Sequence, residues 1–168
     1  TNTDALHSVW KAAAPKFKSD PKVVKHYAQL LIDADAMGAA AKVIESSLNR
    51  NGDDDRIALY GAVNFTHGSK ELLVAETWLK ARPANSTLLL ALGRICLRNE
   101  LWGKARSYFE ASVKIAPALE VYGELSRLLA NLGEKEAADA YFEKYQQLSK
   151  ASLPELPQPT LEKSATPE

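Results

Sequence analysis

Residues 86–117 read STLLLALGRICLRNELWGKARSYFEASVKIAP. In this stretch Gly93 is followed by Ala105 after 12 residues, by Phe109 after 16 and by Pro117 after 24. A glycine, an alanine, a phenylalanine and a proline at these offsets are typical of a 34-residue repeat made of two helices joined by a turn. The stretch therefore predicts a helical hairpin, on which the interpretation of the whole chain depends.

The small residues of this pattern have a physical reason. Gly93 and Ala105 allow two antiparallel helices to cross closely, and Leu89, Leu92 and Phe109 fill the space around the crossing. A single hairpin of this kind cannot bury its apolar face alone. We therefore expect further hairpins on both sides of it.

Similar intervals recur in three other segments, at about 21–52, 54–83 and 119–149. Ala28 takes the place of glycine in the first of them and Ser126 in the last, while the middle segment has a loop two residues shorter than that of 86–117. The helices expected in these three segments are about 22–35, 38–50, 54–65, 70–82 and 135–149.

The sequence thus predicts an all-α fold, a right-handed superhelical stack of helix-turn-helix repeats like the tetratricopeptide repeat, with about nine helices. Residues 1–20 are expected to form an N-terminal capping helix, which Pro15 bends or breaks. Four repeats follow, at about 21–52, 54–83, 86–117 and 119–149. Residues 150–168, which include four prolines, are expected to be a disordered tail.

Composition narrows the possible functions. The 168 residues have a formal net charge of +0, which argues against broad electrostatic attraction to nucleic acid or to an anionic membrane. No apolar run approaches the roughly 20 residues that span a bilayer. One cysteine excludes an internal disulfide framework. The chain begins at Thr1 rather than Met, so we expect it to be a segment of a longer protein.

No sequence motif for phosphate binding, nucleophilic catalysis or zinc hydrolysis is present, so we predict a protein that is not an enzyme and has no cofactor. Cys96 is expected to be a buried structural thiol. The acidic triplet Asp53–Asp55 is expected to cap a helix rather than bind a metal. Six other residues are interpreted as surface or loop histidines (His7, His26, His67) and core tryptophans (Trp10, Trp78, Trp102).

A candidate binding groove follows from the repeat geometry. In stacked hairpins of this type, residues one, four and five positions after the glycine of each first helix are expected to face a concave surface. Arg94, Arg98 and Arg127 converge there in the third and fourth repeats. The predicted partner-binding residues are Arg94, Arg98, Arg127, Asn131, Leu90, Leu97, Gln29 and Lys25.

Two interpretations of these arginines stay open. Like charges gathered without a partner are destabilising, so the groove can bind carboxylates of an acidic peptide, a C-terminus or a small polycarboxylate. Alternatively the arginines are paired internally with Glu100, Glu120 or Glu124, or are simply solvated.

The segment 88–112 also resembles the C-terminal domain of bacterial HemY-like proteins, which are associated with haem biosynthesis. Leu59-Tyr60-Gly61, Trp78-Leu79-Lys80 before Pro83, and Asp20-Pro21 are similar to that family too, and the likeness covers about Trp10 to Tyr145. The resemblance implies a parent protein of the bacterial inner membrane, anchored by N-terminal segments absent from this chain. It implies that the repeat domain lies on the cytoplasmic side. It implies no defined reaction.

The first hypothesis is therefore a non-catalytic interaction or scaffold module that binds an acidic segment of a protein partner, such as a haem-pathway enzyme. The alternative is direct binding of porphyrin or haem, in which the arginines hold the propionates and Leu90, Leu97 and Phe65 contact the macrocycle. A homo-oligomeric scaffold is a third possibility. No nucleic acid is expected as a partner.

Overall fold

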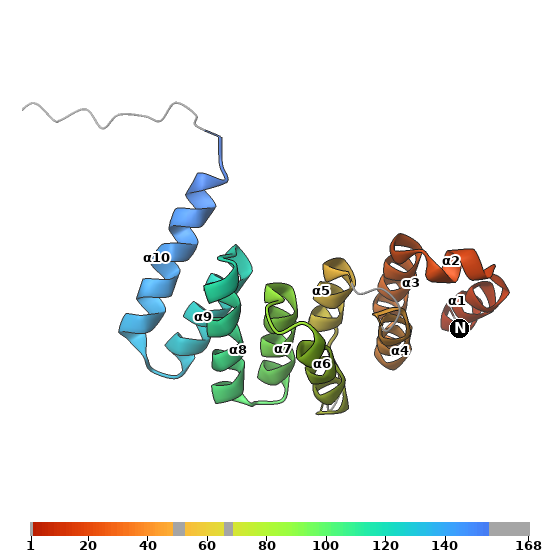
Figure 1. The fold of residues 1–168 in the computed structure, drawn as a ribbon, viewed down its shortest axis with the longest axis horizontal. Coiled ribbons are helices and arrows are strands. Elements are labelled where there is room, and N and C mark those ends of the chain that lie inside the picture. The colour runs from red at the N-terminus through yellow and green to blue at the C-terminus, as the bar shows by residue number, and fades with distance from the viewer. Residues whose placement is uncertain (1, 49–52, 66–68, 155–168) are drawn as a thin grey trace, which may run out of the picture.

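The computed structural model describes residues 2–48, 53–65 and 69–154, which form ten helices and no strands. The helices are α1 (Asn2–Ala12), α2 (Pro15–Ser19), α3 (Pro21–Asp33), α4 (Met37–Leu48), α5 (Asp54–Ala62), α6 (Ser69–Ala81), α7 (Ser86–Arg98), α8 (Trp102–Ile115), α9 (Leu119–Asn131) and α10 (Lys135–Ala151). The hairpins α3–α4, α5–α6, α7–α8 and α9–α10 follow one another along the molecule (Figure 1). The predicted all-α repeat fold is confirmed.

The described residues form ten helices where about nine were expected, because Pro15 divides the N-terminal segment into two helices. Ala14 adopts an extended backbone, with φ −63° and ψ 149°, and Pro15 is the first residue of α2. Proline is well suited to that position because its missing N–H would have no partner in the first turn. The segment expected to be one capping helix thus forms two helices, α1 and α2, and both contact α3.

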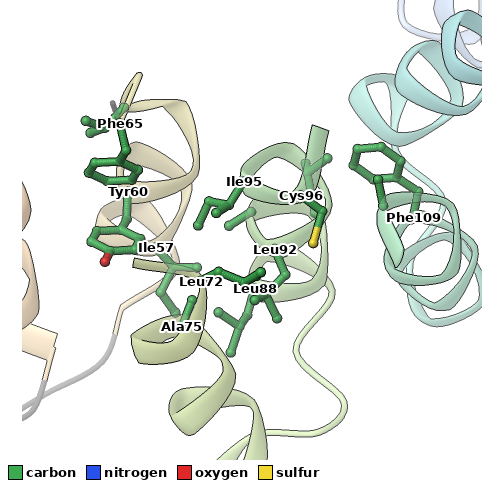
Figure 2. Close-up of a cluster of buried hydrophobic side chains, with 14 of the residues drawn as sticks. Ile57, Tyr60, Phe65, Leu72, Ala75, Leu88, Leu92, Ile95, Cys96 and Phe109 are labelled. Atoms are coloured by element: carbon green, nitrogen blue, oxygen red, sulfur yellow. The ribbon is translucent and has the colours of Figure 1, made fainter. Parts of the chain in front are cut away.

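The crossing of α7 and α8 has the close approach that the sequence predicts. A β-carbon on Gly93 would lie 2.2 Å from Cε1 of Phe109, and Ala105 and Phe109 are fully buried. Figure 2 shows Phe109 pointing from α8 toward the helix that carries Leu92 and Cys96. Because the glycine has no side chain, the phenylalanine ring can occupy the centre of the crossing.

The second and third hairpins share one apolar core. A β-carbon on Gly61 of α5 would lie 2.6 Å from Cα of Ala91 in α7, so these helices touch at the backbone. Tyr60 is fully buried, donates its hydroxyl hydrogen to Glu45 at 2.8 Å and meets the ring of Trp78 edge-on. Figure 2 shows side chains from α5, α6 and α7 meeting in this core.

Polar contacts also connect these two hairpins. Glu76 of α6 accepts hydrogen bonds from Lys104 Nζ at 2.5 Å and from the Tyr108 hydroxyl at 2.8 Å, both on α8. The hydrogen bond from Lys104 lowers the pKa of Glu76, and burial opposes it. Glu76 therefore remains a carboxylate at neutral pH and connects neighbouring repeats.

One type of turn ends the first helix of three repeats. Asp35, Glu100 and Gly133 have positive φ values of 57°, 58° and 82°. In each case the next residue donates its N–H to a carbonyl five residues back, which satisfies the end of the helix. The corresponding turn of the second repeat is the predicted loop Thr66-His67-Gly68-Ser69, of which 66–68 lie outside the described residues.

Some sequence predictions need correction. The helix expected at about 54–65 ends at Ala62, and the helix expected at about 135–149 continues to Ala151. Trp102, predicted to be in the core, is 43% exposed because it begins α8 at the end of a hairpin. Trp10 and Trp78 are partly buried against the core. Residues 155–168 of the tail predicted at 150–168, and the helix stop predicted at Asn51-Gly52, lie outside the described residues.

Other predictions are confirmed. The Asp53 side chain caps α5 by accepting a hydrogen bond from the Arg56 N–H at 3.1 Å. Cys96 is fully buried, and burial raises the pKa of its thiol to about 11. His26 is on the surface, while His7, also exposed, makes a hydrogen bond with the Tyr27 hydroxyl at 3.0 Å.

Candidate functional site

Two of the three predicted arginines share one carboxylate. Arg94 of α7 donates from Nε to Glu124 of α9 at 3.1 Å, and Arg127 pairs with the other oxygen of the same carboxylate. The Glu124 side chain is only 13% exposed, whereas that of Arg127 is 68% exposed. The internal pairing considered from the sequence is thus present for Glu124, and it leaves most of the Arg127 side chain accessible.

Arg98 is engaged with the backbone of the preceding repeat. It donates to the carbonyl oxygens of Gly61 at 2.7 Å and Ala62 at 3.1 Å, which are the last two residues of α5. A cation at this end of a helix satisfies free carbonyls and complements the helix dipole. Burial lowers the pKa of Arg98, and the nearby Arg94 lowers it further. This arrangement supports the fold, so a role of Arg98 in partner binding stays a prediction.

The predicted residues of the first repeat are also engaged locally. Lys25 donates to Asp55 at 2.8 Å, and Gln29 donates to Asp33 at 2.8 Å. Both side chains are exposed and their partners belong to the first two repeats. They therefore do not join the arginines of the third and fourth repeats in one cluster.

The remaining predicted residues differ in their position and exposure. Asn131 donates to the Arg127 carbonyl at 2.9 Å, and Leu97 is partly buried beside it. Leu90 is only 8% exposed, so it contributes mainly to the core. Phe65 is 7% exposed and packs on Tyr60 with ring centroids 5.0 Å apart.

Two cavities meet at Arg127. An open groove of about 580 Å³ lies between α9 and α10, and a second cavity of about 420 Å³ lies at the junction of α7, α8 and α9. We call the two together the C-terminal groove. Its lining includes Arg94, Arg127, Phe142 and Tyr145 in the first cavity, and Leu97, Trp102, Arg127 and Asn131 in the second.

The aromatic side chains of this groove, Phe142 and Tyr145, were not among the residues predicted from the sequence to bind a partner. Phe142 occupies in the fourth repeat the position that Phe109 occupies in the third, but it is 48% exposed and stacks on Tyr145. Two differences account for its exposure: Ser126 replaces the glycine of the crossing, and no described helix follows α10 to cover the ring. The signal was therefore present in the sequence, as a repeat phenylalanine in the last of the described repeats.

The described residues offer no arrangement for metal chemistry. Among them, no three His, Cys, Asp or Glu side chains lie close enough together to hold a metal ion. In the same part of the chain, no helix combines the length and the apolar character needed to cross a membrane.

Residues 119–152, which include the fourth hairpin, match the sequence model of the tetratricopeptide repeat. The fold is a tetratricopeptide-repeat-like stack. No curated protein matches the sequence.

Several solved structures of MamA have a similar tetratricopeptide-repeat-like fold. The structure described as MamA 41-end from Desulfovibrio magneticus RS-1 has a TM-score of 0.59 and 20% sequence identity, covering 80% of this chain and 78% of that one. A MamA RS-1 ArsTM double mutant has a TM-score of 0.61 at 20% identity, covering 89% and 85%. MamA MSR-1 has a TM-score of 0.59 at 16% identity, covering 90% and 88%. At these identities the similarity concerns the fold alone.

Proposed function

We propose that this chain is a non-catalytic interaction module that binds a peptide segment of a partner protein in the C-terminal groove. The observation that carries the proposal is the position of Arg127, an exposed arginine between two cavities with exposed aromatic side chains, Phe142 and Trp102. Exposed aromatic and arginine side chains are enriched where proteins bind one another.

The chemistry of the groove specifies the kind of peptide. A guanidinium has five N–H donors, and Arg127 uses one nitrogen for Glu124. Its remaining donors can hold a carboxylate in a bidentate pair. Apolar side chains on either side of that carboxylate would enter the cavities beside Phe142 and Trp102. The partner segment is therefore an acidic residue flanked by apolar ones.

The resemblance to HemY-like proteins suggests where the module acts. On that basis the partner is a haem-pathway enzyme, and the module is held on the cytoplasmic side of the bacterial inner membrane by segments outside this chain. Direct porphyrin binding has less support, because Phe65 and Leu90 are buried and Arg98 is bound to backbone carbonyls.

The test is selection of peptides from a random display library with the purified chain. We expect peptides with an Asp or Glu between apolar residues, and we expect Arg127→Ala to lose them. Arg127 is preferred to Arg94 for this test because removing it leaves Glu124 paired with Arg94.

Lys135→Ala, an exposed cation at the start of α10, is the matched control and should select the same peptides as the wild type. Selection of the same peptides by Arg127→Ala, or of peptides without acidic residues by the wild type, would overturn the proposal. A visible-absorption titration with haem that saturates would favour the porphyrin alternative instead.

A further inference from the structure

The first cavity of the C-terminal groove lies between α9 and α10, which is the last described helix. The two helices lie side by side at one end of the stack (Figure 1), and a β-carbon on Gly123 of α9 would be 3.7 Å from the ring of Tyr145. Arg127 follows Gly123 by about one helical turn, and Phe142 precedes Tyr145 by about one turn. Because the helices are antiparallel, Arg127 and Phe142 lie at the same level. A segment that continues from α10 and turns back along α9 therefore passes through this cavity.

The cavity has an aromatic wall on α10. Phe142 is 48% exposed and lies parallel to Tyr145, with the ring centroids 6.1 Å apart and 9° between the planes. Exposed aromatic rings in a groove are the surface on which proline-rich segments dock. Proline suits such a surface because its ring fixes φ, so that little conformational freedom is lost on binding.

The charges that line the cavity change along α9. Arg94 and Arg127 share the carboxylate of Glu124, so this part has one positive charge in excess. Glu120 also lines the cavity and is exposed, but it precedes Arg127 by seven residues, which is about 10 Å along the helix. A ligand that runs from the start of α9 toward its end thus meets a negative charge first and the guanidinium of Arg127 second.

The sequence beyond α10 has the complementary order. Residues 156–162, which we call the tail segment, read LPQPTLE, with two prolines among six uncharged residues and then Glu162. The uncharged part can pass Glu120 without repulsion, and Glu162 can form a charge-assisted pair with the remaining donors of Arg127. Leu161, directly before Glu162, is an apolar side chain suited to the space beside Phe142.

The length of the chain fits the distance. Phe142 lies nine residues before the end of α10, which is about 14 Å along the helix. Pro154 is the last described residue, and the eight residues from there to Glu162 can span at most about 26–29 Å. Glu162 is therefore able to reach Arg127. Glu155 directly follows Pro154, so it stays near the end of α10, on the side of Glu120.

We propose that the tail segment of this same chain occupies the first cavity, with Glu162 bound to Arg127 and the prolines against the rings of Tyr145 and Phe142. This proposal rests on the proposed function, because it uses the same cavity and the same arginine. A ligand on a short tether acts at an effective concentration on the order of 1 mM, so even a weak contact keeps the groove occupied. A partner peptide has to displace the tail segment, which lowers the affinity of the chain for partners.

Occupancy is tested on the full chain with a nitroxide spin label at residue 165, introduced by Ala165→Cys. Cys96 is buried and does not compete for the label. We expect the label to broaden the indole N–H signal of Trp102, which lines the neighbouring cavity with Arg127, and to leave that of Trp10 at the other end of the stack unchanged. Arg127→Ala should restore the Trp102 signal. Equal Trp102 signals with and without Arg127→Ala would overturn the proposal.

A mixed sample distinguishes the chain's own tail from that of a second copy. One half of the molecules has the spin label, and the other half has the isotope that makes the indole signals visible. No broadening is expected in this mixture, because the tail segment acts within its own molecule. Broadening of Trp102 in the mixture would place the tail of a second copy in the groove and would contradict the intramolecular assignment.

Competition is measured with a fluorescent peptide of residues 156–165, LPQPTLEKSA, by fluorescence anisotropy. This peptide should bind about tenfold more tightly to the full-length variant Leu161→Ser with Glu162→Gln than to the wild type, because the tethered competitor is weakened. Glu155→Gln removes a carboxylate from the same tail and is the matched control, which should bind the peptide as the wild type does. Equal affinities of the wild type and the double variant would refute the competition.

The results separate this inference from the proposed function. If library peptides are selected through Arg127 while the spin label leaves Trp102 unchanged, the proposed function stands and the tail segment is not the occupant. If the label broadens Trp102 through Arg127 but no library peptide is selected, the groove serves the chain's own tail and the proposed function is wrong.

Discussion

The ring of Phe109 lies directly over the α-carbon of Gly93, so close that a β-carbon on this glycine would be 2.2 Å from Cε1 and 2.5 Å from Cδ1 of the ring. Carbon atoms that are not bonded to each other do not come this close, so the two helices can cross in this way only if residue 93 has no side chain. The contact links a single position in the sequence to the packing of a whole repeat.

Gly93→Ala should therefore destabilise the fold although alanine is the better helix former. Overpacking of a core costs typically about 1–3 kcal/mol, which exceeds the gain of up to about 1 kcal/mol from helix propensity. Gly103→Ala in the same hairpin is the control, since a β-carbon there meets nothing within 4 Å. Urea denaturation followed by circular dichroism measures both. Equal or greater stability of Gly93→Ala would show that the crossing is looser than described.

Phe109→Ala and Phe142→Ala should differ strongly, although the two residues occupy equivalent repeat positions. Phe109 is fully buried, and its removal should cost about 3–5 kcal/mol. Phe142 is 48% exposed, so its removal should cost less than about half as much, while it should weaken peptide binding in the C-terminal groove. Thermal denaturation of the wild type and the two variants measures the loss of stability that each substitution causes. Similar losses of stability would mean that Phe142 is covered in solution.

Arg98→Ala should lower stability by about 1–2 kcal/mol, because the last carbonyls of α5 lose a charged donor. Arg127→Ala, which changes an exposed side chain, should be within about 0.5 kcal/mol of the wild type. The free energies of unfolding and the peptide selections of both variants should be measured together. If Arg98→Ala loses peptide binding at unchanged stability, Arg98 contacts the partner as the sequence predicts.

Cys96 should make stability depend on pH in the alkaline range. Burial raises the pKa of its thiol from the ordinary value of 9.0 to about 11, so above pH 9 the unfolded chain loses this proton more readily than the folded one. The contribution is complete below pH 9 and is lost as the pH rises toward 11, with a slope of at most about 1.4 kcal/mol per pH unit.

Cys96→Ala isolates this contribution, because the tyrosines and lysines that titrate nearby remain. The difference in unfolding free energy between wild type and Cys96→Ala should shrink between pH 9 and 11. A difference that is constant with pH would contradict the burial of the thiol. At pH 8 the folded wild type should also resist a thiol reagent that reacts with it in urea.

The sequence was sufficient for the features that depend on spacing along one hairpin. Gly93, Ala105 and Phe109 meet as predicted, because the 3.6-residue period of a helix fixes which residues share a face. The same reasoning found Asp53 as a cap, since a cap acts on the turn that follows it.

The candidate site could be predicted only in part, because side-chain partners depend on how separate hairpins pack. Arg98 lies on the first helix of its repeat, as expected, but the end of α5 is near enough to bind it. Glu124 was one of three carboxylates named for internal pairing, and spacing alone could not choose it.

The close approach of Gly61 to Ala91 affects the order in which the repeats unfold. The interface between the second and third repeats also contains the hydrogen bonds from Arg98 to α5 and those from Lys104 and Tyr108 to Glu76. In a repeat array each interface between neighbouring repeats adds its own stabilising free energy. The two repeats joined by the strongest interface are therefore the last to unfold. Amide protons of α5 and α7 should thus exchange with deuterium most slowly. The repeats at the two ends of the array should unfold first, and those at the interface between the second and third repeats last.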